Sequence, residues 1–358
     1  MNTIGTDFRI TLFGSSHGPV VGCTIDGCPP SMPLETGMIE EELILRRPQI
    51  GIGTARMERD HLEILSGVRE GVTTGAPITI TIANMDVDSS KYLRFRTVPR
   101  PGHADYPALM KYGESHDISG GGQFSGRMTA AMVAAGAVAK ALLATVNVEV
   151  GAYTRSIGDV VDGEVHPFGQ LVEERRANAV RAASPETSKM MMEAILAAGE
   201  DNDSVGGTVQ CECVGLPVGV GEPFFDSVEG EISKMIFSIP GVKGVEFGSG
   251  FEAARMRGSE HNDPYSVLEG RLITDTNHHG GVLGGITTGM PLVLRVAFKP
   301  TASIGQEQRS VDLGSMSETT LRIEGRHDPC IVPRAVVVVE AVVASVLADL
   351  CMRGGFLG

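Results

Sequence analysis

The sequence lacks the features that mark several common classes of protein. No apolar stretch of about 20 residues is free of charge, and the longest candidate, residues 335–343, contains Glu340. The N-terminus has no basic segment followed by an apolar run, the pattern of a secretory signal. The six cysteines form no CxxC pair, so we expect reduced thiols and no bound metal. These absences predict a cytoplasmic protein that is not bound to a membrane.

Positive charge is scarce overall but locally concentrated. The formal net charge of −14 argues against a nucleic-acid partner, because neutralising phosphates needs a basic face. The 358 residues, 42 % apolar and 21 % charged, suffice for a large buried core. Arginines nevertheless recur beside glycines and in one cluster, which favours a small, multiply anionic ligand. The arginines concerned are Arg46, Arg47, Arg56, Arg100, Arg127 and Arg326.

An internal repeat organises the chain. Residues 67–80 and 281–294 share the pattern Gly-Val-x-x-Gly-(Val/Ile)-Thr-Thr-Gly-x-Pro, followed by alternating apolar residues typical of a strand. A second match, in the same order, pairs residues 21–29 with 209–217. We therefore predict a single domain built from two related halves. The expected parts are halves at about 1–150 and 205–358, a variable connector at 151–204, and an insertion around 258–276.

Hydrophobic periodicity predicts the elements within each half. Two helices, 128–145 and 333–350, are apolar nearly all round, so we expect them to be buried on every side. That favours an α+β fold, a β-α-β sandwich with a helical layer between antiparallel sheets. Asp226 is the expected cap of one further helix. The remaining elements are strands at 8–13, 20–26 and 207–214, and helices at 33–46, 184–198 and 226–239.

Three short motifs place titratable side chains on loops. They are Gly-Ser-Ser-His-Gly at 14–18, Arg-Pro-Gly-His-Ala-Asp at 100–105 and Gly-Arg-His-Asp-Pro at 325–329. Histidine titrates near neutral pH, so the first two motifs supply candidate general acids, and together the three predict a composite enzyme site. Ser16 is not expected to be a hydrolase nucleophile, because a strand rather than a helix follows it. Asp328 alone is more typical of an ion-paired structural carboxylate than of a base.

Two further segments predict anion binding. Residues 120–127 run from three glycines into an apolar helix, where backbone N–H groups bind phosphate or carboxylate. The segment matches neither the P-loop nor the Rossmann fingerprint, so no nucleotide class follows from it. Residues 299–303, Lys-Pro-Thr-Ala-Ser, offer an ammonium and two hydroxyls that suit a second phosphate or a polar heterocycle.

Taken together, these motifs resemble the signatures of the chorismate synthase family. The resemblance covers residues 14–27, 122–136 and 326–340, and weaker counterparts run through the whole chain in order. It implies a phosphate lyase that converts 5-enolpyruvylshikimate 3-phosphate to chorismate by 1,4-anti elimination. It also implies reduced FMN as cofactor, a homotetramer, and NADPH as an external or intrinsic reductant of the flavin.

The same resemblance implies a role for individual residues. Ser16 with His17 would protonate the departing phosphate, His103 would protonate the reduced flavin, and Asp328 would assist removal of the C6 proton. The six arginines named above would hold substrate anions. The residues implied to line FMN are Gln123, Phe124, Ser125, Asn277, Gly284, Lys299, Pro300, Thr301, Ala302, Ser303 and Arg326.

The chain also departs from the family pattern. Ser15 and Gln123 stand where the family has Glu and Arg, an arginine is missing between Arg47 and Arg56, and residues 240–241 replace the usual amide. A catalytically altered paralogue that binds an anionic ligand or flavin is therefore the alternative. A metal-dependent phosphatase would need a cluster of carboxylates with the spacing of metal ligands, and the sequence has none. A non-catalytic anion-binding protein would not explain two loop histidines with an aspartate.

Overall fold

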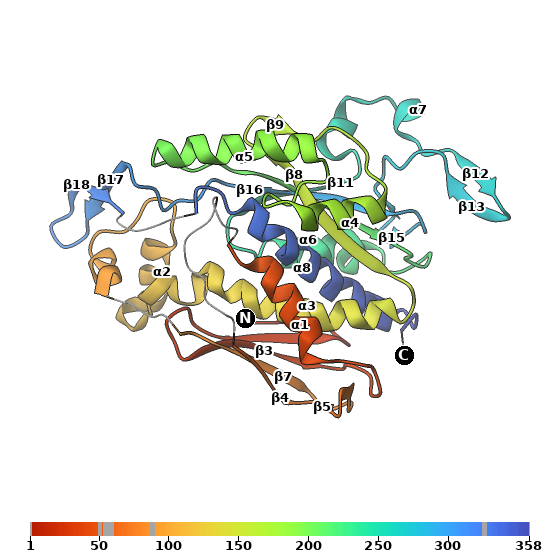
Figure 1. The fold of residues 1–358 in the computed structure, drawn as a ribbon, viewed down its shortest axis with the longest axis horizontal. Helices are drawn as coiled ribbons and strands as arrows, with labels where there is room; N and C mark the ends of the chain where they lie inside the picture. The colour runs from red at the N-terminus through yellow and green to blue at the C-terminus, as the bar shows by residue number, and fades with distance from the viewer. Residues whose placement is uncertain (1, 49–51, 53–60, 86–89, 324–327, 358) are drawn as a thin grey trace.

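Two antiparallel sheets enclose a layer of helices in the computed structural model (Figure 1). The structure describes residues 2–48, 52, 61–85, 90–323 and 328–357. The α+β sandwich expected from the sequence is confirmed. The first sheet has the order β1-β2-β3-β7-β4, with β1 Thr3–Ile4, β2 Arg9–Gly14, β3 Val20–Asp26, β7 Ile78–Ala83 and β4 Leu62–Ser66. The second has the order β11-β16-β10-β8-β9, with β11 Val242–Phe247, β16 Leu292–Phe298, β10 Gly207–Val214, β8 Glu149–Ile157 and β9 Val160–Val161.

The helical layer between the sheets consists of α1, α3, α6 and α8 (Figure 1). Gly136 of α3 allows its closest approach to α8, since a Cβ there would collide with Ala341. The apolar segments Gly126–Ala144 and Val332–Arg353 are long enough to cross a membrane, yet 78 % and 94 % of their most apolar windows are buried as core. The helices are α1 Thr36–Arg46, α2 Asp105–Tyr112, α3 Thr129–Ala144, α4 Phe168–Ala177, α5 Pro185–Glu200, α6 Val228–Ile236, α7 Gly258–His261 and α8 Val332–Arg353.

The two halves repeat the same local structure. The strand sequence β2-β3-β7-β4 across the first sheet corresponds to β8-β10-β16-β11 across the second. In the first half Thr73 Oγ1 donates to the Pro29 carbonyl at 2.6 Å, and in the second Thr287 Oγ1 donates to the Pro217 carbonyl at 2.5 Å. Each threonine also accepts from the backbone N–H three residues after that proline. The equivalent hairpins are β5 Val68–Arg69 with β6 Val72–Thr73, and β14 Val282–Leu283 with β15 Ile286–Thr287.

The second half carries an insertion near the expected place. Between β11 and β14 the chain forms α7 and a hairpin that projects from the body, whereas β4 and β5 follow each other directly in the first half (Figure 1). That hairpin consists of β12 Tyr265–Leu268 and β13 Arg271–Thr274. A separate pair, β17 Glu307–Asp312 and β18 Ser317–Arg322, lies at the opposite end of the molecule (Figure 1).

Three boundaries differ from the sequence-based expectations. Asp226 is not the cap of α6, because the Ser227 hydroxyl accepts from Gly230 N at 3.0 Å, while Asp226 pairs with Arg353 at 2.7 Å. The helix expected from residue 33 begins at Thr36, since Pro33 bridges to Val72. β8 starts before the predicted connector and belongs to the second sheet, so the connector begins after β9.

Candidate active site

A single large cavity gathers the loop motifs of both halves. Its volume is about 1170 Å³, above the range of about 300–1,000 Å³ typical of small-molecule pockets. The first half contributes the Ser16–His17 turn, the loop around His103 and the glycine-rich loop before α3. The second half contributes the chain after α6, the chain after β16 and the first turn of α8. The candidate residues among its lining are Ser16, His17, Arg46, Arg47, Arg100, His103, Gln123, Phe124, Ser125, Arg127, Lys299, Pro300, Thr301, Ala302, Ser303 and Asp328.

The Ser16–His17 turn joins β2 to β3 and is fixed against the glycine-rich loop. Ser16 N donates to Gly122 O at 3.3 Å, and Ser125 Oγ donates to Ser16 Oγ at 3.1 Å. Gly120 has φ +60°, and a side chain there would collide with the His17 ring. Glycine is therefore required for the loop to lie against the imidazole. The His17 ring also meets the Tyr92 ring edge-on, with centroids 5.2 Å apart.

The glycine-rich loop leads through two short 3-10 turns, η3 Ser119–Phe124 and η4 Gly126–Met128, into α3. Ser125 caps the second turn, since its hydroxyl accepts from Arg127 N at 3.2 Å. The cavity lining includes Gly126, Arg127 and Thr129 at the start of α3, and the backbone dipole of this helix favours an anion there.

The arginines of the cavity have different partners. Arg46 is buried and donates to Thr129 Oγ1 at 2.8 Å and to Gly126 O at 3.0 Å, so it braces the start of α3. Arg127 NH2 donates to Ala83 O at 3.0 Å. Arg47 lines the cavity beside the end of α1. Arg56 and Arg326 lie outside the described residues.

Arg100 is engaged by a carboxylate of its own motif. Its guanidinium donates two hydrogen bonds of 2.7 Å to Asp105 and lies 4.5 Å from the centre of the Phe95 ring. Burial raises the pKa of the Asp105 carboxyl, but the hydrogen bonds from Arg100 lower it further, so this pKa lies below its usual value. The buried pair keeps the loop rigid, and Asp105 offsets much of the charge that Arg100 could offer a ligand.

His103 is held as a neutral imidazole in one tautomer. Nδ1 donates to the Pro101 carbonyl at 3.0 Å, because a carbonyl oxygen only accepts. Nε2 then accepts from Ser303 Oγ at 2.9 Å. Burial, followed by the positive charge of Arg100, lowers the pKa of His103 to about 4. Burial likewise lowers the pKa of Lys299 in the same part of the cavity.

The lowered pKa makes a testable prediction for the ligand-free protein. The His103 imidazole should titrate near pH 4 in a nuclear magnetic resonance titration, rather than near its ordinary value of 6.5. The unfolded chain binds this proton more readily, so stability should fall as the pH drops from about 6.5 towards 4. His103→Gln should remove that part of the pH dependence. A midpoint near 6.5 in the native protein would contradict the assignment.

Asp328 meets an arginine that the motifs did not single out. It is buried and forms an ion pair with Arg334, in the first turn of α8. Arg334 Nε also donates to the Arg46 carbonyl at 3.2 Å, which joins the ends of α1 and α8. Asp328 therefore has both the ion pair expected of a structural carboxylate and a place on the cavity wall.

Two predicted cofactor residues do not reach the cavity. Asn277 Nδ2 donates to the Pro291 carbonyl at 2.8 Å, and Gly284 lies in the β14–β15 hairpin. That hairpin meets the start of α6, since Val228 N donates to Gly285 O, whereas the cavity meets the end of that helix. The lining also includes residues that the motifs did not single out, among them Asn84, Tyr92 and Arg334. Only Arg334, a charge at the start of an apolar helix, carried a signal that could have been noticed.

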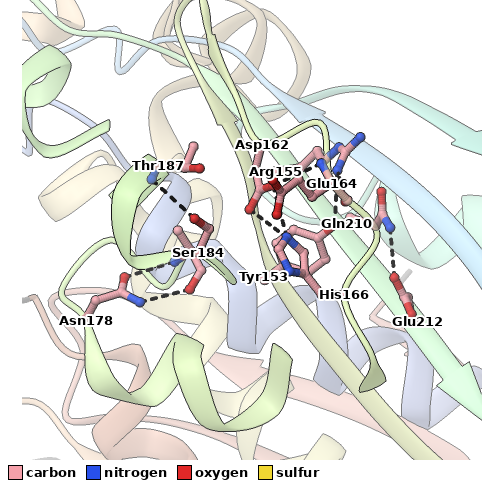
Figure 2. A network of polar contacts seen from close by, with 11 residues as sticks. Tyr153, Arg155, Asp162, Glu164, His166, Asn178, Ser184, Thr187, Gln210 and Glu212 are labelled. Carbon is pink, nitrogen blue, oxygen red and sulfur yellow. Dashed lines mark hydrogen bonds and ion pairs between the residues drawn. The ribbon is translucent and has the colours of Figure 1, made fainter. Parts of the chain in front are cut away.

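Other polar groups lie away from the cavity. His166 and Asp162 are buried and 3.0 Å apart, and the His166 ring meets Tyr153 on β8 edge-on (Figure 2). Among the described residues no group of three or more His, Cys, Asp or Glu side chains could hold a metal ion. Burial raises the pKa of every cysteine thiol, which makes the thiolates unfavourable.

Fold and cavity define the class: an α+β enzyme with two antiparallel sheets around a helical layer, and an arginine-lined cavity that collects serine, histidine and aspartate side chains. The sequence pattern of the chorismate synthase family matches residues 8–352. A chorismate synthase of Korarchaeum cryptofilum is 51 % identical over 98 % of this chain and 97 % of that protein. One from Dehalococcoides mccartyi is 47 % identical over 99 % and 98 %. A crystal structure of chorismate synthase superposes with a TM-score of 0.78, 31 % identity, and coverage of 98 % and 93 %. The chain belongs to the chorismate synthase family, and it is a lyase.

Proposed function

We propose that this chain converts 5-enolpyruvylshikimate 3-phosphate to chorismate and inorganic phosphate. The observation that carries the proposal is the meeting of the Ser16–His17 turn, His103 and Asp328 on one cavity lined by arginines. In this 1,4-anti elimination the C3–O bond breaks as phosphate leaves and a proton leaves C6, so a second ring double bond forms without net oxidation. The substrate carries two carboxylates and a phosphate, which suits a cavity of this charge.

Each residue is assigned a role from its position on the cavity wall. His17, supported by Ser16, would give a proton to the departing phosphate. Arg127 and the start of α3, on the same side of the cavity, stabilise the negative charge of that group. Asp328 on the opposite half would assist removal of the C6 proton. Arg47, with Arg56 and Arg326, is assigned to the substrate carboxylates.

We propose reduced FMN as the cofactor. The cavity has room for two small molecules, and residues 299–303 line it beside His103. Phe124 is half-exposed on the cavity wall next to His116, their ring centres 5.8 Å apart, which provides an aromatic surface for a flat ring system. When bound, reduced flavin would supply electron density to the allylic system from which phosphate departs. An anion bound beside His103 would raise the pKa of that imidazole towards neutrality, which the role of proton donor requires.

The purified protein tests this function directly. Under anaerobic conditions with reduced FMN, we expect equal amounts of chorismate and phosphate, unaffected by EDTA. Phosphate release without chorismate would indicate a phosphatase, and tight substrate binding without turnover would indicate an altered paralogue. Oxidation of NADPH by the protein with FMN, measured without an added reductase, would show whether NADPH can be the intrinsic reductant.

We also propose that the chain forms a homotetramer in the cytoplasm. The β12–β13 hairpin exposes Tyr265, Val267 and Leu272 by 65–73 %, although a two-stranded hairpin is only marginally stable by itself. Contact with other copies would cover these side chains. Light scattering should give four times the chain mass at micromolar concentration, and Val267→Asp should shift the mass downward. A monomer in the unmodified protein would contradict the proposal.

A further inference from the structure

Asn84, at the end of β7, joins two parts of the cavity through one side chain. Its Nδ2 donates to Ser15 O at 3.0 Å and to Gly18 O at 2.8 Å, the two carbonyls that flank the Ser16–His17 turn. Its Oδ1 accepts from Arg127 Nε at 2.9 Å. Both donors of the amide and its acceptor are therefore used at the cavity wall.

The orientation of this amide is determined by its partners. Carbonyl oxygens only accept and a guanidinium only donates, so the reversed amide would face like groups on both sides. The backbone beside it is also fixed, because Asn84 N donates to Pro19 O at 3.0 Å. Arg127 NH2 also donates to the carbonyl of Ala83, the residue before Asn84. The planar amide thus holds the turn on one side and the guanidinium on the other.

A second chain of hydrogen bonds joins the same two groups. Ser125 Oγ donates to Ser16 Oγ and accepts from Arg127 N. Together with the Asn84 amide, these bonds close a ring that includes the Ser16–His17 turn and Arg127. Loss of Asn84 opens this ring, while the bonds of Ser16 to Ser125 and Gly122 on the other side remain.

We propose that Asn84 is a positioning residue of the lyase. It fixes the Ser16–His17 turn relative to Arg127, so that the proton donor His17 and the cation Arg127 both contact the same leaving phosphate. The inference rests on the proposed roles of His17 and Arg127. Misplacement of a reacting group by about 1 Å can cost 10²-fold in rate, so losing this bridge should reduce turnover strongly while the fold persists.

Two substitutions separate the two ends of the bridge. Asn84→Ala removes all three hydrogen bonds, and we expect kcat to fall about 10²-fold with a smaller change in KM. Asn84→Asp keeps an acceptor for Arg127 but presents oxygen to the carbonyls of Ser15 and Gly18. We expect it to lose as much turnover as Asn84→Ala, because the turn is released in both. Near-normal kcat in Asn84→Asp would overturn the positioning of the turn.

Asn178 provides a matched control away from the cavity. Its Nδ2 donates to the Glu174 carbonyl at 2.7 Å. The same nitrogen donates to the Ala182 carbonyl at 2.8 Å, and Oδ1 accepts from Ala182 N at 3.0 Å (Asn178 is labelled in Figure 2). Asn178→Ala should lower the melting temperature by about 2–4 °C and leave kcat and KM of the folded protein unchanged. If Asn84→Ala behaves in the same way, its role is only structural and the proposal is wrong.

A double-mutant cycle and a spectrum complete the test. In His17→Ala protein, adding Asn84→Ala should change kcat by less than about 2-fold, because the residue to be positioned is gone. Independent, additive losses would overturn the proposal. The His17 imidazole resonance should shift in Asn84→Ala and not in Asn178→Ala, and an unchanged resonance would also overturn it. This spectrum needs no turnover, so it decides on Asn84 even if the unmodified protein proves inactive and the proposed function fails.

Discussion

His17→Ala should lower kcat by about 10²–10⁴-fold, the usual contribution of a positioned general acid. The imidazole lies on the cavity wall between the Tyr92 ring and the glycine-rich loop, and Ser16 beside it is fixed by Ser125. The substrate should still bind, because the cations and the start of α3 supply most of the attraction. Anaerobic single-turnover measurement of phosphate release, with substrate affinity measured separately, tests both statements.

The control is His61→Ala, which changes an exposed histidine outside the cavity lining. It should leave kcat unchanged. A His17→Ala protein that turns over normally, or that fails to bind substrate, would contradict the role of proton donor. If His17→Ala, His103→Ala and Asp328→Asn all lost flavin binding to the same degree, the three residues would be scaffold instead.

Glu340→Leu should lower the free energy of unfolding by about 3–5 kcal/mol, the cost of breaking a buried ion pair. Glu340 lies inside α8 with no exposed surface, pairs with Lys140 at 2.7 Å and with Arg175, and accepts from Ala152 N at 2.6 Å. Burial lowers the pKa of Arg175 to about 10 and also lowers that of Lys140. Removing the carboxylate therefore leaves the buried Arg175 and the partly buried Lys140, with Glu42 as the remaining acidic partner of Lys140 among the described residues.

Urea unfolding measures this effect. Glu318→Leu is the comparison, because its ion pair with Arg309 is almost fully exposed and surface pairs contribute about 0–1 kcal/mol. The network joins α3 of the first half to α8 and β8 of the second half and to α4 of the connector, so its loss should also reduce cooperativity between the halves. Equal destabilisation by the two substitutions would show that Glu340 contributes no more than a surface charge.

Local sequence patterns determined the elements and the candidate residues. The all-round apolar composition of two segments predicted the buried helices α3 and α8, because a helix without a polar face has no side to turn to water. The repeated Gly/Thr/Pro turns predicted the duplicated halves, since the same turn chemistry requires the same residues. The glycine-framed motifs predicted the loops that carry Ser16, His17 and His103.

Only the tertiary structure decided how those loops meet and what surrounds each side chain. The depressed pKa of His103 comes from burial and from Arg100, and the bond of Nε2 to Ser303 crosses about 200 positions of sequence. Asn84 belongs to no motif, and Arg334 was not singled out within the signature at 326–340. The bonds of Asn84 to Ser15 and Gly18 and that of Arg334 to the Arg46 carbonyl join residues distant in the chain. Sequence periodicity reports which face of an element is buried, whereas distances between loops depend on how two sheets and four helices pack, which no local pattern encodes.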